Sequence, residues 1–72
     1  MQLLETLPLE VEGGTIPVQL FEDAAEDGKK TIYKIGVDDV IWMSTESKFH
    51  ATILFNMMHE HIKQYMHYEK TR

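Results

Sequence analysis

The first two thirds of the chain either alternate between apolar and polar residues or are rich in β-branched side chains. Both patterns are typical of strands. Four segments show them: residues 9–12, 15–21, 31–37 and 40–43. Because only short connections separate these segments, we predict an antiparallel β-meander of three or four strands over residues 9–44.

Turn-forming residues separate the predicted strands. The glycine pair at residues 13–14 lies between two alternating segments, where a tight hairpin turn requires positive φ angles. The acidic pair at residues 38–39 is a second predicted turn, and the charged segment 22–30 is a predicted loop. Pro17 has no backbone donor, so we expect its strand to lie at an edge of the sheet or to be bulged there.

Residues 46–70 contain neither glycine nor proline and are predicted to form one long helix. Ser44, Thr45 and Ser47 offer side-chain oxygens that can cap its first N–H groups. We therefore predict a single α+β domain over residues 1–72, in which a three- to four-stranded antiparallel β-meander packs against one long C-terminal α-helix.

One face of this helix collects large apolar side chains, because successive residues are about 100° apart around the axis. We expect that face to cover the sheet. The predicted core combines it with apolar strand residues: Val18, Tyr33, Ile35, Trp42, Leu54, Met58, Ile62 and Tyr65.

Three further apolar residues, Phe49, Ile53 and Met57, recur at every fourth position on another side of the helix, where a solvated face would be polar. We name them the helix stripe. Exposed apolar patches usually mark contacts, so the helix stripe predicts a surface for a protein partner or for self-association. The alternative is a covering segment of the same chain: residues 1–8 are predicted to be a short strand or part of an arm, and an arm of residues 1–12 would cover the stripe.

The end of the helix is a second predicted contact surface. A helix of this length spans roughly 36 Å, whereas a compact chain of this size has a diameter of about 29 Å. The last turns are therefore predicted to extend past the sheet. Tyr65, Met66 and Tyr68 lie there and are large and partly apolar, which suits a contact surface.

Composition and charge exclude several classes of protein. The 72 residues include no cysteine, so neither disulfides nor thiolate zinc sites are available. No segment approaches the roughly 18 consecutive apolar residues of a membrane span, and the N-terminus lacks a signal-peptide pattern. We expect a cytoplasmic protein without a membrane partner. Residues 1–47 carry a net charge of −7 and residues 48–72 one of +2, which argues against direct nucleic-acid binding through the sheet.

No residue pattern indicates catalysis, a metal or a cofactor. His59 and His61 point about 200° apart on a helix, and the zinc-protease pattern would need a histidine where the chain has Lys63. Capping accounts for the hydroxyls near the helix start, and the paired carboxylates lie in predicted loops, where nothing apolar would raise their pKa values. We predict no catalytic, metal-binding or cofactor-binding residues, and we predict that the protein is not an enzyme.

The acidic residues of the predicted loops form pairs: Glu22, Asp23, Glu26, Asp27, Asp38 and Asp39. Carboxylates at phosphate-like separations can imitate nucleic acid and occupy basic grooves. In a meander, however, the segments 22–30 and 38–39 lie at opposite ends. This arrangement favours an acidic solvated rim that keeps the protein in solution.

These observations predict a small non-catalytic protein-binding module. It would act as an inhibitor, adaptor or regulatory subunit of a larger protein, through its helix or its acidic edge. Small acidic proteins of this kind are common among virus-encoded modulators, so the partner could be a host protein. Two alternatives stay open. One is an acidic inhibitor that mimics nucleic acid and blocks a DNA- or RNA-binding enzyme. The other is a structural homo-oligomer whose helix stripes pair across a two-fold axis.

Overall fold

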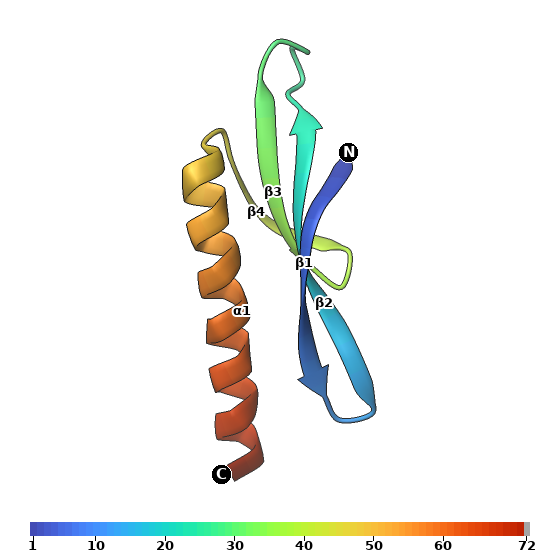
Figure 1. Ribbon diagram of the computed structural model, residues 1–72, viewed down its shortest axis with the longest axis vertical. Coiled ribbons are helices and arrows are strands. Elements are labelled where there is room, and N and C mark those ends of the chain that lie inside the picture. Colours follow the sequence, from blue (N-terminus) through green and yellow to red (C-terminus); the bar gives the residue numbers. More distant parts are fainter. Residues whose placement is uncertain (72) are drawn as a thin grey trace.

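The computed structural model describes the backbone of residues 1–71 and the side chains of residues 1–65. Four strands precede one helix (Figure 1): β1 (Gln2–Val11), β2 (Gly14–Ala24), β3 (Thr31–Val37), β4 (Val40–Thr45) and α1 (Lys48–Thr71). The predicted α+β fold is confirmed, with four strands in one antiparallel sheet. Residues 2–8 belong to β1 and do not form an arm.

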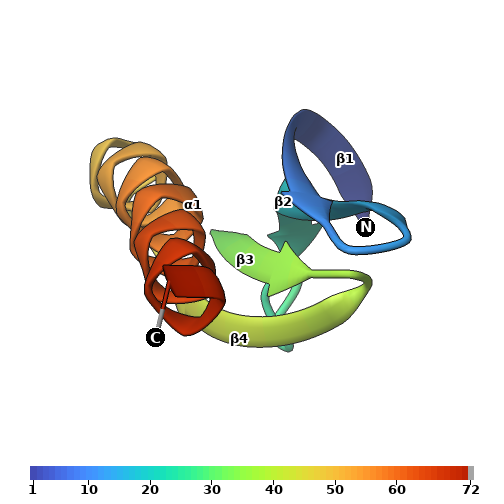
Figure 2. The ribbon, with the colours of Figure 1, turned by 90° about the horizontal axis from the view of Figure 1, so that it is seen from below.

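The sheet has the order β1-β2-β3-β4, so each strand pairs with its neighbour in the chain. β1 and β2 pair from Gln2↔Glu22 to Val11↔Gly14, with a register shift between Leu3 and Glu5. Figure 2 shows that the strands follow a curved, twisted path and that α1 lies on one side of them. The molecule is elongated, because its radius of gyration is 13.5 Å, whereas about 11 Å is expected for a compact chain of this length.

The two predicted hairpin turns are present. Gly13 has a φ of 90° in the turn between β1 and β2, a conformation that glycine adopts without strain. Asp38 and Asp39 have φ angles of 51° and 69° in the turn between β3 and β4. The backbone N–H of Asp39 donates to Gln19 Oε1, and Gln19 Nε2 donates to Asp39 Oδ1, both at 2.9 Å. Because the Gln19 side chain is buried, this reciprocal pair fixes the turn against β2.

Pro17 lies in an inner strand, although an edge position was expected for its strand. The pairing of β2 with β3 begins at Val18, so β2 has only β1 as a neighbour at Pro17. The missing N–H therefore removes no bond to β3. The Pro17 carbonyl oxygen accepts the backbone N–H of Asp38 at 2.9 Å, which ties the β3–β4 turn to this position.

The core lies between the sheet and α1. Its buried residues come from three strands and the helix: Leu9, Val18, Leu20, Ile35, Val37, Ala51 and Phe55. Among the predicted core residues, Tyr33, Leu54, Met58 and Ile62 are half-buried against this cluster.

Two predicted core residues are exposed, and their predicted burial was wrong. Trp42 is the extra residue of a β-bulge, since Ile35 pairs with Met43 while the next residue, Gly36, pairs with Ile41. The bulge removes Trp42 from the alternation that the prediction assumed. Tyr65, near the C-terminal end of α1, exposes 59% of its surface.

The sheet also has apolar residues on the face opposite α1. Phe21 is buried there, and a Cβ added to Gly36 would lie 3.3 Å from the Phe21 ring and 3.3 Å from Ile41 Cδ1. The absence of a side chain at Gly36 therefore leaves room for both neighbours. This small second cluster contains Phe21 and Ile41.

Hydrogen bonds fix both the start and the middle of α1. Ser47 Oγ accepts the backbone N–H of His50 at 3.2 Å, the geometry of an N-cap. Further along the helix, His59 Nε2 lies 2.8 Å from the Pro8 carbonyl oxygen of β1. Because a carbonyl oxygen only accepts, this imidazole nitrogen carries the proton. The contact places β1 on the His59 side of the helix.

Candidate functional site

The helix stripe is exposed to solvent. Phe49, Ile53 and Met57 expose 71%, 41% and 60% of their surface, respectively. At about 100° per residue, they lie roughly opposite the fully buried Phe55. The stripe therefore points away from the sheet. Met57, at its C-terminal end, lies on the side of α1 that is opposite His59.

The alternative in which an N-terminal arm covers the helix stripe does not occur. Residues 2–11 form β1, which pairs with β2 along its whole length. The half-buried Leu4 and Leu7 of this strand pack against the core on the other side of α1. The stripe thus has no cover from the part of the chain that the structure describes.

Two polar side chains, Thr52 and Asn56, flank the stripe on one side of the helix. Thr52 Oγ1 donates to the Lys48 carbonyl oxygen at 3.0 Å, and Asn56 Nδ2 donates to the Thr52 carbonyl oxygen at 2.8 Å. Both bonds go to the backbone of α1, so they hold these polar side chains against the helix and leave the stripe accessible. The Phe49 and His50 rings lie 5.9 Å apart at a tilt of 55°.

The second predicted contact surface is described only in part. Of this surface, Tyr65 is exposed to solvent. Met66 and Tyr68 lie in the same helix, but their side chains are outside the described residues.

The predicted acidic surface is divided between two places. Glu22 and Asp23 lie at the end of β2, and Glu26 and Asp27 lie in the loop that follows. Asp38 and Asp39 form the β3–β4 turn, and Asp39 binds Gln19. The carboxylates therefore do not form one continuous row.

Basic groups also neutralise part of the negative charge near the end of β2. Lys34 Nζ donates to Asp23 Oδ2 at 3.0 Å, and the Met1 amino group lies 3.6 Å from Asp23 Oδ1. The hydrogen bond from Lys34 is the main reason that the pKa of Asp23 lies below its usual value, and a second hydrogen bond from the Ala24 backbone N–H adds to the effect. Asp23 is thus held as a paired carboxylate on the surface of the sheet.

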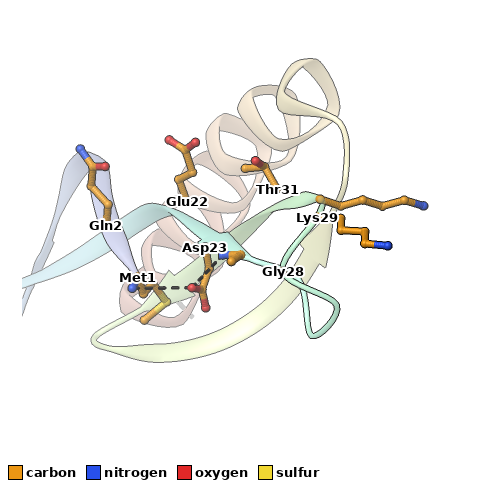
Figure 3. Close-up of a pocket in the computed structure, with 9 residues that line it drawn as sticks. Met1, Gln2, Glu22, Asp23, Gly28, Lys29 and Thr31 are labelled. Carbon is orange, nitrogen blue, oxygen red and sulfur yellow. Dashed lines mark hydrogen bonds and ion pairs between the residues drawn. The ribbon is translucent and has the colours of Figure 1, made fainter.

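An open pocket of about 500 Å³ lies beside Asp23 (Figure 3). Its lining comes from the first two residues of the chain, from the end of β2 and from the β2–β3 loop with the first residue of β3. The lining residues include Met1, Glu22, Lys29 and Thr31. Its walls carry both signs of charge and more polar than apolar surface, whereas ligand sites are mostly apolar with a few placed polar groups. The pocket therefore gives no basis for choosing a ligand.

Three of the four histidines, His50, His59 and His61, belong to the side chains that the structure describes. Among the side chains that the structure describes, no three of the types His, Cys, Asp and Glu lie close enough together to hold a metal ion. His59 hydrogen-bonds β1, as described above, which gives it a structural contact.

Sequence reasoning missed one exposed apolar surface. Val40, Ile41 and Trp42 expose 61%, 39% and 61% of their surface, respectively, at the start of β4. We name these three residues the β4 patch. The signal in the sequence was three consecutive large apolar residues directly after an acidic turn. That signal was interpreted as a buried strand, because periodicity alone does not distinguish a buried run from an exposed edge.

Within the described residues, α1 contains no stretch that is both long and apolar enough to cross a membrane. A scan against protein-family models and searches of curated proteins and of solved structures found no match for this chain.

Proposed function

We propose that the protein is a small, non-catalytic, cytoplasmic module that binds a larger protein through the helix stripe. The observation that supports this proposal is the exposure of Phe49, Ile53 and Met57 on the side of α1 that faces away from the sheet. A helix whose only task was to cover the sheet would carry polar residues there.

The spacing of the stripe suits a helix that lies in a groove of its partner. Such helices present apolar anchors one turn apart, and the partner supplies an apolar channel. Fully burying a large apolar side chain contributes about 1.5–3 kcal/mol. The stripe's three partly exposed residues therefore offer roughly 5 kcal/mol before the cost of association is subtracted.

Binding of this kind would make the protein an inhibitor, an adaptor or a regulatory subunit. The exposed Tyr65 extends the apolar surface along the same helix. Ala51 and Phe55 pack α1 against the sheet, so the helix is already formed before binding, which lowers the conformational entropy that binding would cost.

The test is a pull-down with the tagged full chain from nuclease-treated lysate of the source cells, washed at moderate and at high salt. Ile53→Asp places a charge in the middle of the stripe. Thr52→Asp is the matched control, because it adds the same charge to an exposed position one residue away, about 100° around the helix axis from Ile53. We expect one stoichiometric partner to survive the high-salt wash with the unmodified chain and with Thr52→Asp, and to be lost with Ile53→Asp.

Circular dichroism of the Ile53→Asp variant checks that the domain still folds. Unfolding of this variant would show that the stripe belongs to the core, and the proposed binding surface would be wrong. Loss of the partner from the unmodified chain at high salt would assign binding to the acidic residues instead. Equal capture by both variants would also contradict the proposal.

A further inference from the structure

We propose that β4 is a self-association edge, at which the β4 strands of two copies pair antiparallel across a two-fold axis. This surface is separate from the helix stripe. A second copy is favoured as the occupant because the two ends of β4 carry opposite charges, which an antiparallel pair of identical strands brings together.

The two edges of the sheet differ in protection. Edge strands commonly carry prolines or charges, or are covered, because their unpaired backbone groups attract other strands. β1 contains Pro8, Glu5 and Glu10, and His59 of α1 contacts its backbone. β4 has the sequence VIWMST, which includes neither a charge nor a proline. The β4 edge therefore lacks the proline, the charges and the helix contact of the β1 edge, and its bulge at Trp42 is the feature that limits pairing along it.

The side chains of β4 add an apolar contact to the free backbone groups. Alternate residues of a strand point to opposite faces, so the exposure of the neighbours Val40 and Ile41 in the β4 patch means that both faces are solvated at this end. Exposed apolar runs of this length are unusual unless they serve an interaction. The bulge at Trp42 presents an indole near the middle of the strand. In a two-fold pair of β4 strands, the two Trp42 side chains therefore lie near the axis.

Charges at the two ends make the edge self-complementary. Asp38 and Asp39 directly precede β4, and Lys48 follows it at the start of α1. Near the same end, Lys30 Nζ lies 3.9 Å from Glu46 Oε1, which offsets that carboxylate. Antiparallel pairing brings the acidic end of one β4 beside the lysine end of the other. A parallel arrangement would bring like charges together.

The available area predicts a weak and reversible dimer. Full burial of the exposed parts of the β4 patch would remove of the order of 300 Å² of side-chain surface per copy. A standard stable interface buries about 800 Å² per partner. We therefore expect self-association in the micromolar range or weaker, with a dependence on salt because the end charges contribute.

The experiment is sedimentation equilibrium of the full chain between about 10 μM and 1 mM, where interfaces of small area dissociate. The unmodified chain is expected to form dimers as the concentration rises, and Trp42 emission is expected to shift to shorter wavelength in parallel. Trp42→Lys should raise the dissociation constant at least tenfold, because two lysines would meet near the axis.

Lys48→Glu separates association from folding. The first turn of α1 contains no acidic residue, so a glutamate there interacts favourably with the helix dipole and should raise the melting temperature. The same change places like charges at the ends of the paired strands and should weaken the dimer. Lys63→Glu makes the identical charge change at an exposed position far along α1, and we expect it to leave the dimer unchanged.

Three results would overturn the proposal. One is a monomer at every concentration, and another is a dimer that Lys48→Glu and Trp42→Lys leave intact. The third is a dimer that is lost in Ile53→Asp but kept in Trp42→Lys, which would assign self-association to the helix stripe. Partner capture in the pull-down depends on the helix stripe and not on β4, so Trp42→Lys should retain it. Failure of the proposed partner binding can therefore be distinguished from failure of the proposed self-association.

Discussion

Two phenylalanines on the same helix provide the sharpest test of how α1 is oriented. Phe55 is fully buried, whereas Phe49 exposes 71% of its surface. The substitutions Phe55→Ala and Phe49→Ala remove the same atoms six residues apart. Any difference in their effect on the free energy of unfolding therefore comes from their surroundings.

The expected magnitudes differ widely. Truncation of a buried phenylalanine to alanine costs about 3–5 kcal/mol. A 72-residue domain has a total stability of roughly 4–11 kcal/mol, so Phe55→Ala removes a large part of it. Phe49 loses little burial, and alanine has the higher helix propensity by up to about 0.7 kcal/mol. We expect Phe49→Ala to change the stability by less than about 0.5 kcal/mol.

Urea unfolding followed by far-ultraviolet circular dichroism measures both variants. Trp42 fluorescence is a weaker probe of unfolding, because this side chain is already exposed in the folded domain. A low protein concentration keeps self-association out of the measurement. Phe55→Leu provides a milder second variant with an expected cost of about 1 kcal/mol, in case Phe55→Ala does not fold.

Equal destabilisation by Phe49→Ala and Phe55→Ala would refute this orientation. It would mean that the helix stripe is covered in solution, and the proposed binding surface would lose its basis. A small effect at both positions would mean that α1 does not pack on the sheet.

Three further predictions concern the sheet. Gly36→Ala should cost about 1–3 kcal/mol of stability, as measured by urea unfolding, because the added Cβ would lie 3.1 Å from a backbone carbonyl oxygen of β4. Asp39→Ala should cost about 1–3 kcal/mol because it leaves Nε2 of the buried Gln19 without its acceptor, while the backbone N–H of residue 39 still donates to Gln19 Oε1; Asp39→Asn should cost less. Lys34 lowers the pKa of Asp23 below 3.8 in the fold. The ionised Asp23 therefore stabilises the fold above that pH, and its contribution to the free energy of unfolding decreases as the pH falls further. An acid titration of the stability of Asp23→Asn should lack this decrease.

Local patterns in the sequence determined most of the fold. Alternation of apolar and polar residues located the strands, and the glycine pair and the aspartate pair located both hairpin turns. The serine before α1 caps it as expected. These features depend on neighbours within a few residues, which is why the sequence alone predicts them.

The candidate surfaces depended on packing that local patterns do not contain. The apolar character of the helix stripe was visible in the sequence, but its exposure follows from the position of β1 in the sheet. Trp42 was expected in the core, and a bulge relative to β3 exposes it. Phe21 is buried on the face that no helix covers, because Gly36 of the neighbouring strand leaves space for its ring.

The sequence by itself therefore determined where the helix, both hairpin turns and most strand residues lie, and which residues share a face wherever no bulge interrupts the alternation. Only the tertiary structure decided which faces are covered, which edge of the sheet is left open and which acidic groups find partners. The physical reason is that secondary structure depends on backbone and side-chain preferences over a few residues, whereas burial depends on segments far apart in the chain that meet only when the fold is complete.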